Sequence, residues 1–466
     1  MPHPLLATRE SDHPSAVPIH LVTEEGFATA KEGLSERART FAAAQGFEPK
    51  PGAHCLLPAE DGTLGGVLFG IDGPDAKGAD PFLVGKLPTV LPEGTYRFET
   101  PPADPALAAL AWLLGSYRFA RYRQAPEKAR RLVPTPGTDA EEVSRLADAV
   151  TLGRDLVNTP ANDLGPEEIE AAVRALGERH GATVEAIVGD ELLQKNFPMI
   201  HAVGRASPRA PRLVDLAWGD PAAPRVTVVG KGVAFDTGGL NLKPDASMLL
   251  MKKDMGGAAA AMALADMVMG AGLPVRLRLL VPAVENAVSG ASFRPGDVLK
   301  SRKGLSVEIG NTDAEGRLIL ADALALADEE APEVLVDFAT LTGAARVALG
   351  PELPPLYTDD EALAGDLARL ARAVNDPVWR MPLWRPYAKL LDSKVADLNH
   401  ISGGPFAGSV TAALFLTRFV EKAKSFAHFD VYAWNPAAKP ARPEGGEVQG
   451  ARLVYALLKE RYGRSA

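Results

Sequence analysis

Residues 311–318 bring together the side chains best suited to chemistry in this chain. Their sequence, Asn-Thr-Asp-Ala-Glu-Gly-Arg-Leu, places Asp313, Glu315 and Arg317 at alternate positions directly before an apolar run. Residues two apart in an extended segment project to the same side, so we expect both carboxylates to share one ligand. Two like charges repel unless a cation compensates them. The stretch therefore predicts a cation site with a guanidinium beside it.

The glycine-rich segment 229–257 carries a second set of charges. Its sequence is VGKGVAFDTGGLNLKPDASMLLMKKDMGG, and it contains Lys231, Asp236, Lys243 and Asp254. The glycines around Asp236 let the backbone bend tightly around a ligand. Little else explains so many charges in such a segment, so we expect the two segments to meet in one hydrolytic centre.

Four acids in these segments are candidates for a shared site: Asp236, Asp254, Asp313 and Glu315. If they converge, two divalent cations would compensate their charges and leave Lys243 and Arg317 for substrate or an anion. Hard oxygen ligands, with the nitrogen of Lys231 as a further candidate, suit Mn²⁺ or Mg²⁺ and tolerate Zn²⁺. The alternative is a salt-bridge network between the same acids and the nearby lysines.

A nucleotide site is another interpretation of the glycine-rich segment, and its residues argue against it. Gly230-Lys231-Gly232 resembles the start of a dinucleotide loop, but Phe235 replaces the third glycine of that motif. The segment also contains no lysine followed by serine or threonine, as a Walker-type phosphate loop requires. We therefore do not expect nucleotide binding.

The elements that must position these residues alternate between strands and helices. Apolar strand patterns at 225–230, 275–283, 334–340 and 427–434 are separated by helical patterns at 256–270 and after Arg317. This order predicts an α/β fold with a mostly parallel central sheet flanked by helices on both faces. Ligands in such sheets bind outside the carboxyl ends of the strands, which is where the charged residues fall.

The first 120 or so residues predict a smaller α/β domain, because short apolar runs alternate with turns before a helical run. Proline and charge then dominate 124–139, which we interpret as a linker before a helix that begins near Ala140. The predicted domains are an N-terminal α/β domain, 1–130, and a C-terminal catalytic domain, 139–466.

Composition limits the class of protein. The chain has 466 residues, 46% of them hydrophobic, which is enough for two cores. Charges interrupt its apolar stretches well short of the roughly 20 residues that cross a bilayer. A single cysteine, Cys55, and an N-terminus without the pattern of a secretory signal favour a cytoplasmic protein. The formal net charge of −9 argues against a nucleic-acid partner.

Several motifs together resemble the leucyl aminopeptidase family of two-metal peptidases. They are VGKGVAFDTGGLNLKP, MKKDMGGAA, PAVENAVSG, RPGDVL and NTDAEGRLILADAL, in that family's order and spacing. The resemblance runs from about Arg154 to the motifs AALFLTRFV and AHFDVYAW, which end at Trp434, and it implies a macro-like fold for the N-terminal domain. The stretch 435–453 departs from the family pattern, which leaves the outer rim of the pocket undefined.

The resemblance implies two divalent metal ions per subunit, Mn²⁺ or Zn²⁺, with Mg²⁺ or Co²⁺ as alternatives. It makes Asp236 and Glu315 ligands of both ions, Asp313 a ligand of one, and Lys231 and Asp254 ligands of the other.

The same resemblance makes Lys243 and Arg317 catalytic. Lys243 stabilises the oxyanion, and Arg317 holds a bicarbonate ion that relays the proton. The implied substrate-binding residues are Met251, Thr340, Leu341 and Gly343.

The implied function is release of N-terminal amino acids from peptides by a cytoplasmic homohexamer. Because methionine gives an adaptable wall, leucine-like or methionine-like N-terminal residues are expected to be preferred. The alternatives are a narrow dipeptidase, for example one that cleaves cysteinylglycine, and a DNA-binding architectural factor, against which the acidic balance argues.

Overall fold

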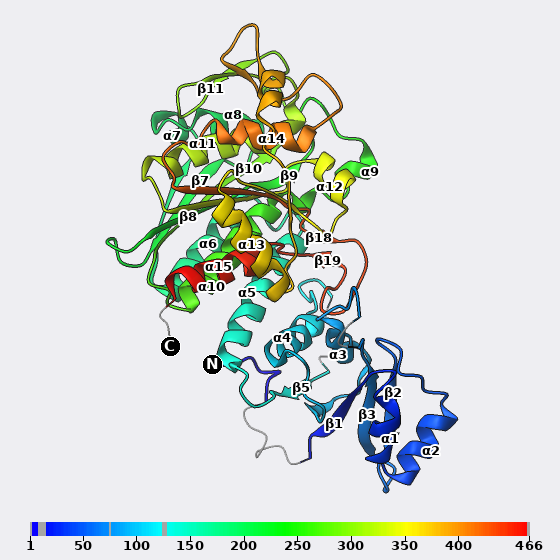
Figure 1. Ribbon diagram of the computed structural model, residues 1–466. Coiled ribbons are helices and arrows are strands. Elements are labelled where there is room, and N and C mark those ends of the chain that lie inside the picture. The colour runs from blue at the N-terminus through cyan, green and yellow to red at the C-terminus, as the bar shows by residue number, and fades with distance from the viewer. Residues whose placement is uncertain (1, 8–14, 74–75, 124–127, 464–466) are drawn as a thin grey trace. The chain divides into compact units, whose positions relative to one another are not determined.

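The computed structural model describes residues 2–7, 15–73, 76–123 and 128–463, and it divides into two compact units (Figure 1). The first unit contains residues 1–151 and 437–444, and the second contains 152–436 and 445–466. The domain limits predicted from sequence, 1–130 and 139–466, stay a prediction. No described helix has the length and apolar character needed to span a membrane.

The first unit is built on a five-stranded sheet in the order β2-β3-β1-β4-β5. Strand β1 pairs in parallel with both β3 and β4, and β2 pairs antiparallel with β3. The strands are β1 (Val17–Val22), β2 (His54–Pro58), β3 (Leu64–Gly70), β4 (Gly94–Phe98) and β5 (Arg130–Val133); the helices are α1 (Phe27–Glu32), α2 (Glu36–Ala44), η2 (Leu83–Lys86), α3 (Leu87–Val90) and α4 (Pro105–Ser116).

Two features of this unit differ from the sequence-based expectation. The predicted linker 124–139 contains β5, which pairs in parallel with β4 and has two buried residues, Leu132 and Val133. Residues 124–127 of the predicted linker lie outside the described part. Residues 437–444 belong to this unit, although they fall in the stretch that we associated with the pocket rim. Within the unit, Arg442 contacts Asp80 at 3.3 Å.

The second unit contains a nine-stranded sheet that is mostly parallel at its centre. Strand β8 pairs in parallel with β10 and β13, and β13 pairs in parallel with β17. Strands β6, β7 and β14 add antiparallel pairs toward the edges. The strands are β6 (Thr183–Val188), β7 (Arg212–Trp218), β8 (Arg225–Gly230), β9 (Gly232–Asp236), β10 (Arg276–Asn286), β13 (Val334–Ala339), β14 (Pro355–Tyr357), β15 (Trp379–Arg380) and β17 (Ser425–Asp430).

Helices cover both faces of this sheet, which confirms the predicted α/β class (Figure 1). Every residue of β13 is buried, as expected for a strand between two helical layers. One layer contains α6 (Pro166–His180), α10 (Gly256–Gly270), α13 (Glu361–Ala373) and α15 (Ala451–Tyr462), and the other contains α8 (Pro198–Gly204), α11 (Gly316–Glu329) and α14 (Gly408–Thr417). Helix α5 (Ala140–Asn158) begins where the sequence predicted a helix.

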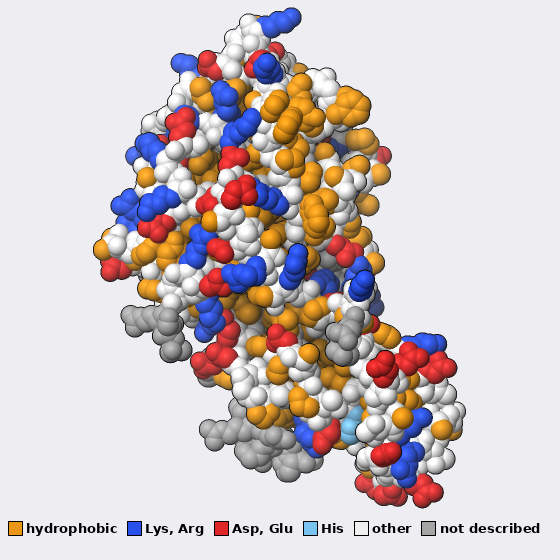
Figure 2. All heavy atoms as spheres, viewed as in Figure 1, with side chains coloured by type: hydrophobic (Ala, Val, Ile, Leu, Met, Phe, Trp, Pro, Cys, Tyr) orange, Lys and Arg blue, Asp and Glu red, His pale blue; other side chains and the backbone are white. Residues whose placement is uncertain are grey.

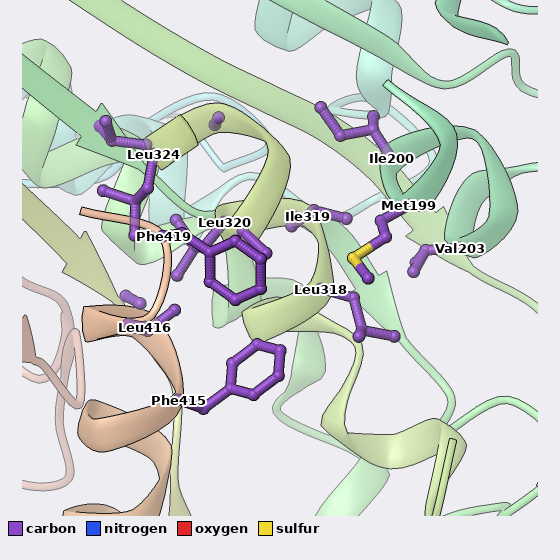
Figure 3. Close-up of a cluster of buried hydrophobic side chains, with 14 of the residues drawn as sticks. Met199, Ile200, Val203, Leu318, Ile319, Leu320, Leu324, Phe415, Leu416 and Phe419 are labelled. Carbon is purple, nitrogen blue, oxygen red and sulfur yellow. The ribbon is translucent and has the colours of Figure 1, made fainter. Parts of the chain in front are cut away.

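The second helical layer packs through a cluster of aliphatic and aromatic side chains. Phe415 of α14 and Phe419, two residues beyond its end, point toward Leu318 and Leu320 of α11, and Met199 of α8 lies on the other side of α11 (Figure 3). This packing fixes α11, whose first turn directly follows the acids of residues 311–318. On the outer surface, acidic and basic side chains are interspersed over the visible face without a field of one sign (Figure 2).

Shorter elements connect these layers. The helical segments are α7 (Glu191–Gln194), α9 (Asp245–Met248), η3 (Met251–Met255), η4 (Thr312–Ala314), α12 (Gly343–Leu349) and η5 (Arg385–Leu391); the strands are β11 (Val298–Lys300), β12 (Ser306–Glu308), β16 (Leu398–Asn399), β18 (Trp434–Asn435) and β19 (Gly445–Gly446). Of these, η3, η4 and α12 carry residues of the candidate site.

Candidate active site

The carboxyl ends of the central parallel strands bring four polar residues together. Lys231 follows β8, Asn286 ends β10, Thr340 follows β13 and Asp430 ends β17. Because the four strands run in parallel, their carboxyl ends lie at one edge of the sheet. The site therefore forms at the position that the strand pattern predicted.

A tight turn after β9 holds Asp236 in place. The amide of Gly238 donates to Asp236 Oδ1 at 2.8 Å, and Asn286 Nδ2 donates to the same oxygen at 2.8 Å. Gly239 has a φ of +63°, and a Cβ there would lie 2.9 Å from Thr312 Oγ1. Both the left-handed backbone and the close approach require glycine at this position.

Lys231 forms the centre of a buried charged group. Its Nζ lies 2.7 Å from Asp254 Oδ2 and 3.1 Å from Glu315 Oε1, and it donates to the carbonyl of Thr340 at 2.8 Å. Burial opposes the charge on Lys231, but Asp254, Glu315 and Asp236 together outweigh it and raise the pKa of the ammonium group. Lys231 is therefore a cation in this arrangement.

Lys243 forms a second, more accessible group of charges. Its Nζ lies 2.9 Å from Asp236 Oδ2 and 2.5 Å from Asp313 Oδ1. Burial opposes its charge as well, and the same two acids raise the pKa of Lys243. The structure thus brings together both lysines and all four acids that the sequence singled out.

The backbone around Asp313 and Glu315 differs from the extended segment that we predicted. Asp313 lies in the short 3₁₀ helix η4, and Glu315 directly precedes α11. The extended geometry was wrong because the Asn311 side chain accepts the Asp313 amide and starts a helical turn. Ligand oxygens of Asp236, Asp313 and Glu315 nevertheless lie within 4.8 Å of one another.

The donor set suits divalent cations. Four carboxylates face two ammonium groups, so negative charge is in excess. Three of their buried oxygens, Asp254 Oδ2, Asp313 Oδ1 and Glu315 Oε1, have a lysine ammonium group at 2.7, 2.5 and 3.1 Å and accept no other hydrogen bond from the described residues. Burial, and then the charge of Asp236, raises the pKa of Glu315 to about 8 and that of Asp313 to about 6. Hard oxygen atoms crowded in this way fit Mn²⁺, Mg²⁺ or Zn²⁺.

Arg317 is separate from this group, at the first turn of α11. Its Nη1 donates to the carbonyl of His400 at 2.7 Å, while its buried Nε has no hydrogen-bond partner among the described residues. Burial lowers the pKa of Arg317 to about 10, and the charges of Asp430 and Glu315 oppose this effect. The side chain thus remains a cation with a free donor, which suits a small anion.

A cavity of about 420 Å³ opens beside the charged group. It is lined by Lys231, Asp236, Lys243, Asp254 and Asp313, and by the four predicted substrate-binding residues Met251, Thr340, Leu341 and Gly343. Neither Glu315 nor Arg317 is among the described residues that line it.

The cavity also contains residues that the sequence analysis missed. Asp430 accepts the amides of Leu341 and Thr342 at 3.0 and 3.1 Å, and so it fixes the loop that forms one wall. Lys253, Arg346 and Tyr432 form another part of the lining. Burial lowers the pKa of Lys253 to about 8. An acid at the end of an apolar strand, as in AHFDVYAW, was the only sequence signal for Asp430.

Comparison with known proteins agrees with this geometry. Residues 151–455 match the catalytic domain of the cytosol aminopeptidase family, and residues 17–134 match the N-terminal domain of M17 aminopeptidases. The chain belongs to the cytosol aminopeptidase family. It is therefore an aminopeptidase, a hydrolase of a metal-dependent family, which confirms the resemblance found in the sequence motifs.

Individual relatives support this assignment. The chain is 39% identical to a probable cytosol aminopeptidase of Geobacter sulfurreducens, over 77% of this chain and 75% of the relative. A crystal structure of a cytosol aminopeptidase from Coxiella burnetii matches with a TM-score of 0.92 and 44% identity, over 96% of this chain and 98% of that one. The bottromycin maturation enzyme BotP in complex with Mn matches with a TM-score of 0.86 and 33% identity, over 96% and 99%.

Proposed function

We propose that this aminopeptidase uses two divalent ions, Mn²⁺ or Zn²⁺, to release N-terminal amino acids from peptides. Asp236 and Glu315 would bind both ions, Asp313 one, and Lys231 and Asp254 the other. The observation that carries the proposal is that oxygens of Asp236, Asp313 and Glu315 lie within 4.8 Å of one another, while Asp254 lies 2.7 Å from the Lys231 ammonium group that also contacts Glu315. When bound, the ions would polarise the scissile carbonyl and activate water.

The residues of the chain would supply the remaining chemistry. Lys243 lines the cavity as a cation, so it can stabilise negative charge on the carbonyl oxygen during attack. Arg317 has a buried Nε without a partner among the described residues, which supports binding of bicarbonate as a proton relay. Lys231 would have to lose its proton to act as a ligand, since a metal ion competes for the same lone pair.

The apolar part of the cavity supports a preference for leucine or methionine at the N-terminus. Leu250, Met251 and Leu341 provide aliphatic and thioether surface against which such side chains can pack. A panel of aminoacyl p-nitroanilides measures this preference. It is refuted if lysyl or acidic N-terminal residues are cleaved fastest.

Metal titration tests the central proposal. Chelator-treated protein should have no activity on leucyl-p-nitroanilide, and calorimetry should find two ions bound as Mn²⁺ or Zn²⁺ restores it. Asp313→Asn should weaken binding, whereas Asp245→Asn, an exposed acid of α9, should not. Full activity after chelation, or binding of one ion at full activity, contradicts a two-ion site.

Assembly and location complete the proposal. We expect a homohexamer in the cytoplasm, by analogy with the family resemblance of the sequence motifs. Light scattering coupled to size exclusion measures the subunit number, and a mass below that of six subunits argues against the hexamer.

A further inference from the structure

One part of the cavity lining carries positive charge instead of acids. Lys253 of η3 and Arg346 of α12 both lie against the ring of Tyr432, and all three residues line the cavity. Lys253 Nζ is 4.5 Å from the ring centroid, and Arg346 Cζ is 5.4 Å from it. Arg346 Nη1 also donates to Tyr432 Oη at 3.3 Å. The aromatic ring thus holds two cations in the wall of one cavity.

Neither cation has a carboxylate of the described chain within ion-pair distance, although the charges of Asp254 and Asp430 act on Lys253. Lys253 is only 6% exposed, and a buried ammonium group is costly unless an anion accompanies it. No described carboxylate forms an ion pair with Lys253 or Arg346. Cation–π contact stabilises a charge only partly, so the pair retains its capacity to bind an anion.

The two acids whose charges act on Lys253, Asp254 and Asp430, form their hydrogen bonds and ion pairs with other groups. Asp254 contacts Lys231 at 2.7 Å through one oxygen and accepts the Thr340 hydroxyl at 2.8 Å through the other. Asp430 accepts two backbone amides of the cavity loop and the Thr342 hydroxyl, the latter at 2.6 Å. Both carboxylates are therefore held by the protein that positions them.

We propose that Lys253 and Arg346 bind a carboxylate of the peptide substrate, a specificity that rests on the aminopeptidase function proposed above. A carboxylate is the planar anion that a guanidinium group binds best, and an adjacent ammonium group adds a further charged donor. A peptide offers it in two places: the α-carboxylate of a dipeptide, or the side chain of an N-terminal aspartate or glutamate. The first source would make the enzyme favour dipeptides.

Two pairs of substrates that differ by one carboxylate distinguish these sources. Metal-loaded, full-length protein is assayed on Leu-Gly against Leu-Gly-amide, and on Glu-Gly-amide against Gln-Gly-amide. In one pair we expect the substrate that carries the additional carboxylate to be cleaved with a kcat/KM about tenfold higher, mainly through a lower KM. A hydrogen bond to a charged group contributes about this factor to affinity. The ratio within each pair cancels any general effect of a substitution on turnover.

Variants then test whether Lys253 and Arg346 cause this ratio. Lys253→Met and Arg346→Gln should each bring the ratio toward one, and Lys253→Arg should restore it. Lys252→Met is the matched control, because the Lys252 ammonium donates to the carbonyl of Asn158 at 2.7 Å; its ratio should equal that of the wild type. Circular dichroism confirms that each variant is folded before its ratio is measured.

Two results overturn the proposal: ratios near one for both pairs in the wild type, or a preference that survives in the Lys253→Met/Arg346→Gln double variant. Absence of cleavage in all four substrates refutes the proposed function instead. In that case calorimetry with metal-loaded protein compares Leu-Gly with Leu-Gly-amide and Glu-Gly-amide with Gln-Gly-amide. Equal affinities within both pairs would then refute carboxylate binding, and a difference that Lys253→Met removes would support it.

Discussion

Gly257 is the position where a single methyl group should damage both the fold and the site. It lies in the first turn of α10, and a Cβ there would be 2.2 Å from the carbonyl oxygen of Phe338 and 2.9 Å from Ala339 Cα. Both of these atoms belong to the backbone of β13, so no side-chain rotation can relieve the overlap. Helix and strand would have to separate by roughly 1 Å to restore van der Waals contact.

The expected cost of Gly257→Ala follows from this overlap. Forcing extra volume into a packed interior costs about 1–3 kcal/mol in the free energy of unfolding, and the rigid backbone on both sides favours the upper end. The site should suffer more. Asp254 lies three residues before Gly257, and the next residue, Ala258, donates its amide to the carbonyl of Lys231 at 2.8 Å. A displacement of about 1 Å can lower kcat/KM by about 100-fold.

Urea unfolding, metal titration and leucyl-p-nitroanilide cleavage measure these effects. Gly365→Ala is the matched control, because Gly365 lies inside α13 and a Cβ there meets nothing within 4 Å. That control should be more stable by about 0.5–1 kcal/mol, since alanine favours helix over glycine, with activity unchanged. A Gly257→Ala protein with wild-type stability and metal affinity would refute the claim that α10 and β13 must touch here.

Three further predictions concern buried charges. Glu447→Gln should lower the free energy of unfolding by about 3–5 kcal/mol in urea, because it removes the negative charge that lies 2.8 Å from the 1%-exposed Arg154 side chain. Burial and then the charge of Arg317 lower the pKa of His400 to about 3 in the folded protein. The contribution of neutral His400 to the free energy of unfolding is therefore complete above pH 6.5, and it is lost as the pH falls toward 3, because the histidine of the unfolded chain gains a proton first. Between pH 7 and 5 the free energy of unfolding of the wild type should fall by about 2 kcal/mol more than that of His400→Asn. Arg317→Ala should lower turnover while calorimetry finds metal affinity retained, and full activity without added bicarbonate would contradict its role.

The acids and lysines of the site could be predicted because the signal is local. Charges among glycines, placed after apolar strand patterns, indicate a site whatever the order of strands in the sheet. The strands at 225–230 and 334–340 and the helix at 256–270 follow from apolar runs of suitable length, and the structure confirms all three.

The remaining features depend on contacts between distant segments. Lys252 and Lys253 are identical neighbours in sequence, yet one bonds to the carbonyl of Asn158 while the other is buried against Tyr432. Nothing in the local pattern distinguishes them, since the difference arises because Lys252 faces the end of helix α5 and Lys253 faces the segment that follows β17. The same reason explains why β5 was missed: its two buried residues, Leu132 and Val133, gain their place by pairing with β4 and, at Leu132, by a bridge to Leu6.

The two proposals together give the cavity a polarity that would orient a substrate. Its acidic part holds an excess of negative charge that divalent ions and a free amino terminus can neutralise, and Lys253 directly precedes the acid Asp254 of that part. A short peptide carries opposite charges at its two ends, so the electrostatic field favours one direction of entry over the other. Reversing the charge with Lys253→Glu should therefore raise KM for Leu-Gly more than for Leu-Gly-amide, and more so at low ionic strength because salt screens the field. An effect on KM that is equal for the acid and the amide, or independent of salt, would mean that Lys253 only packs against Tyr432.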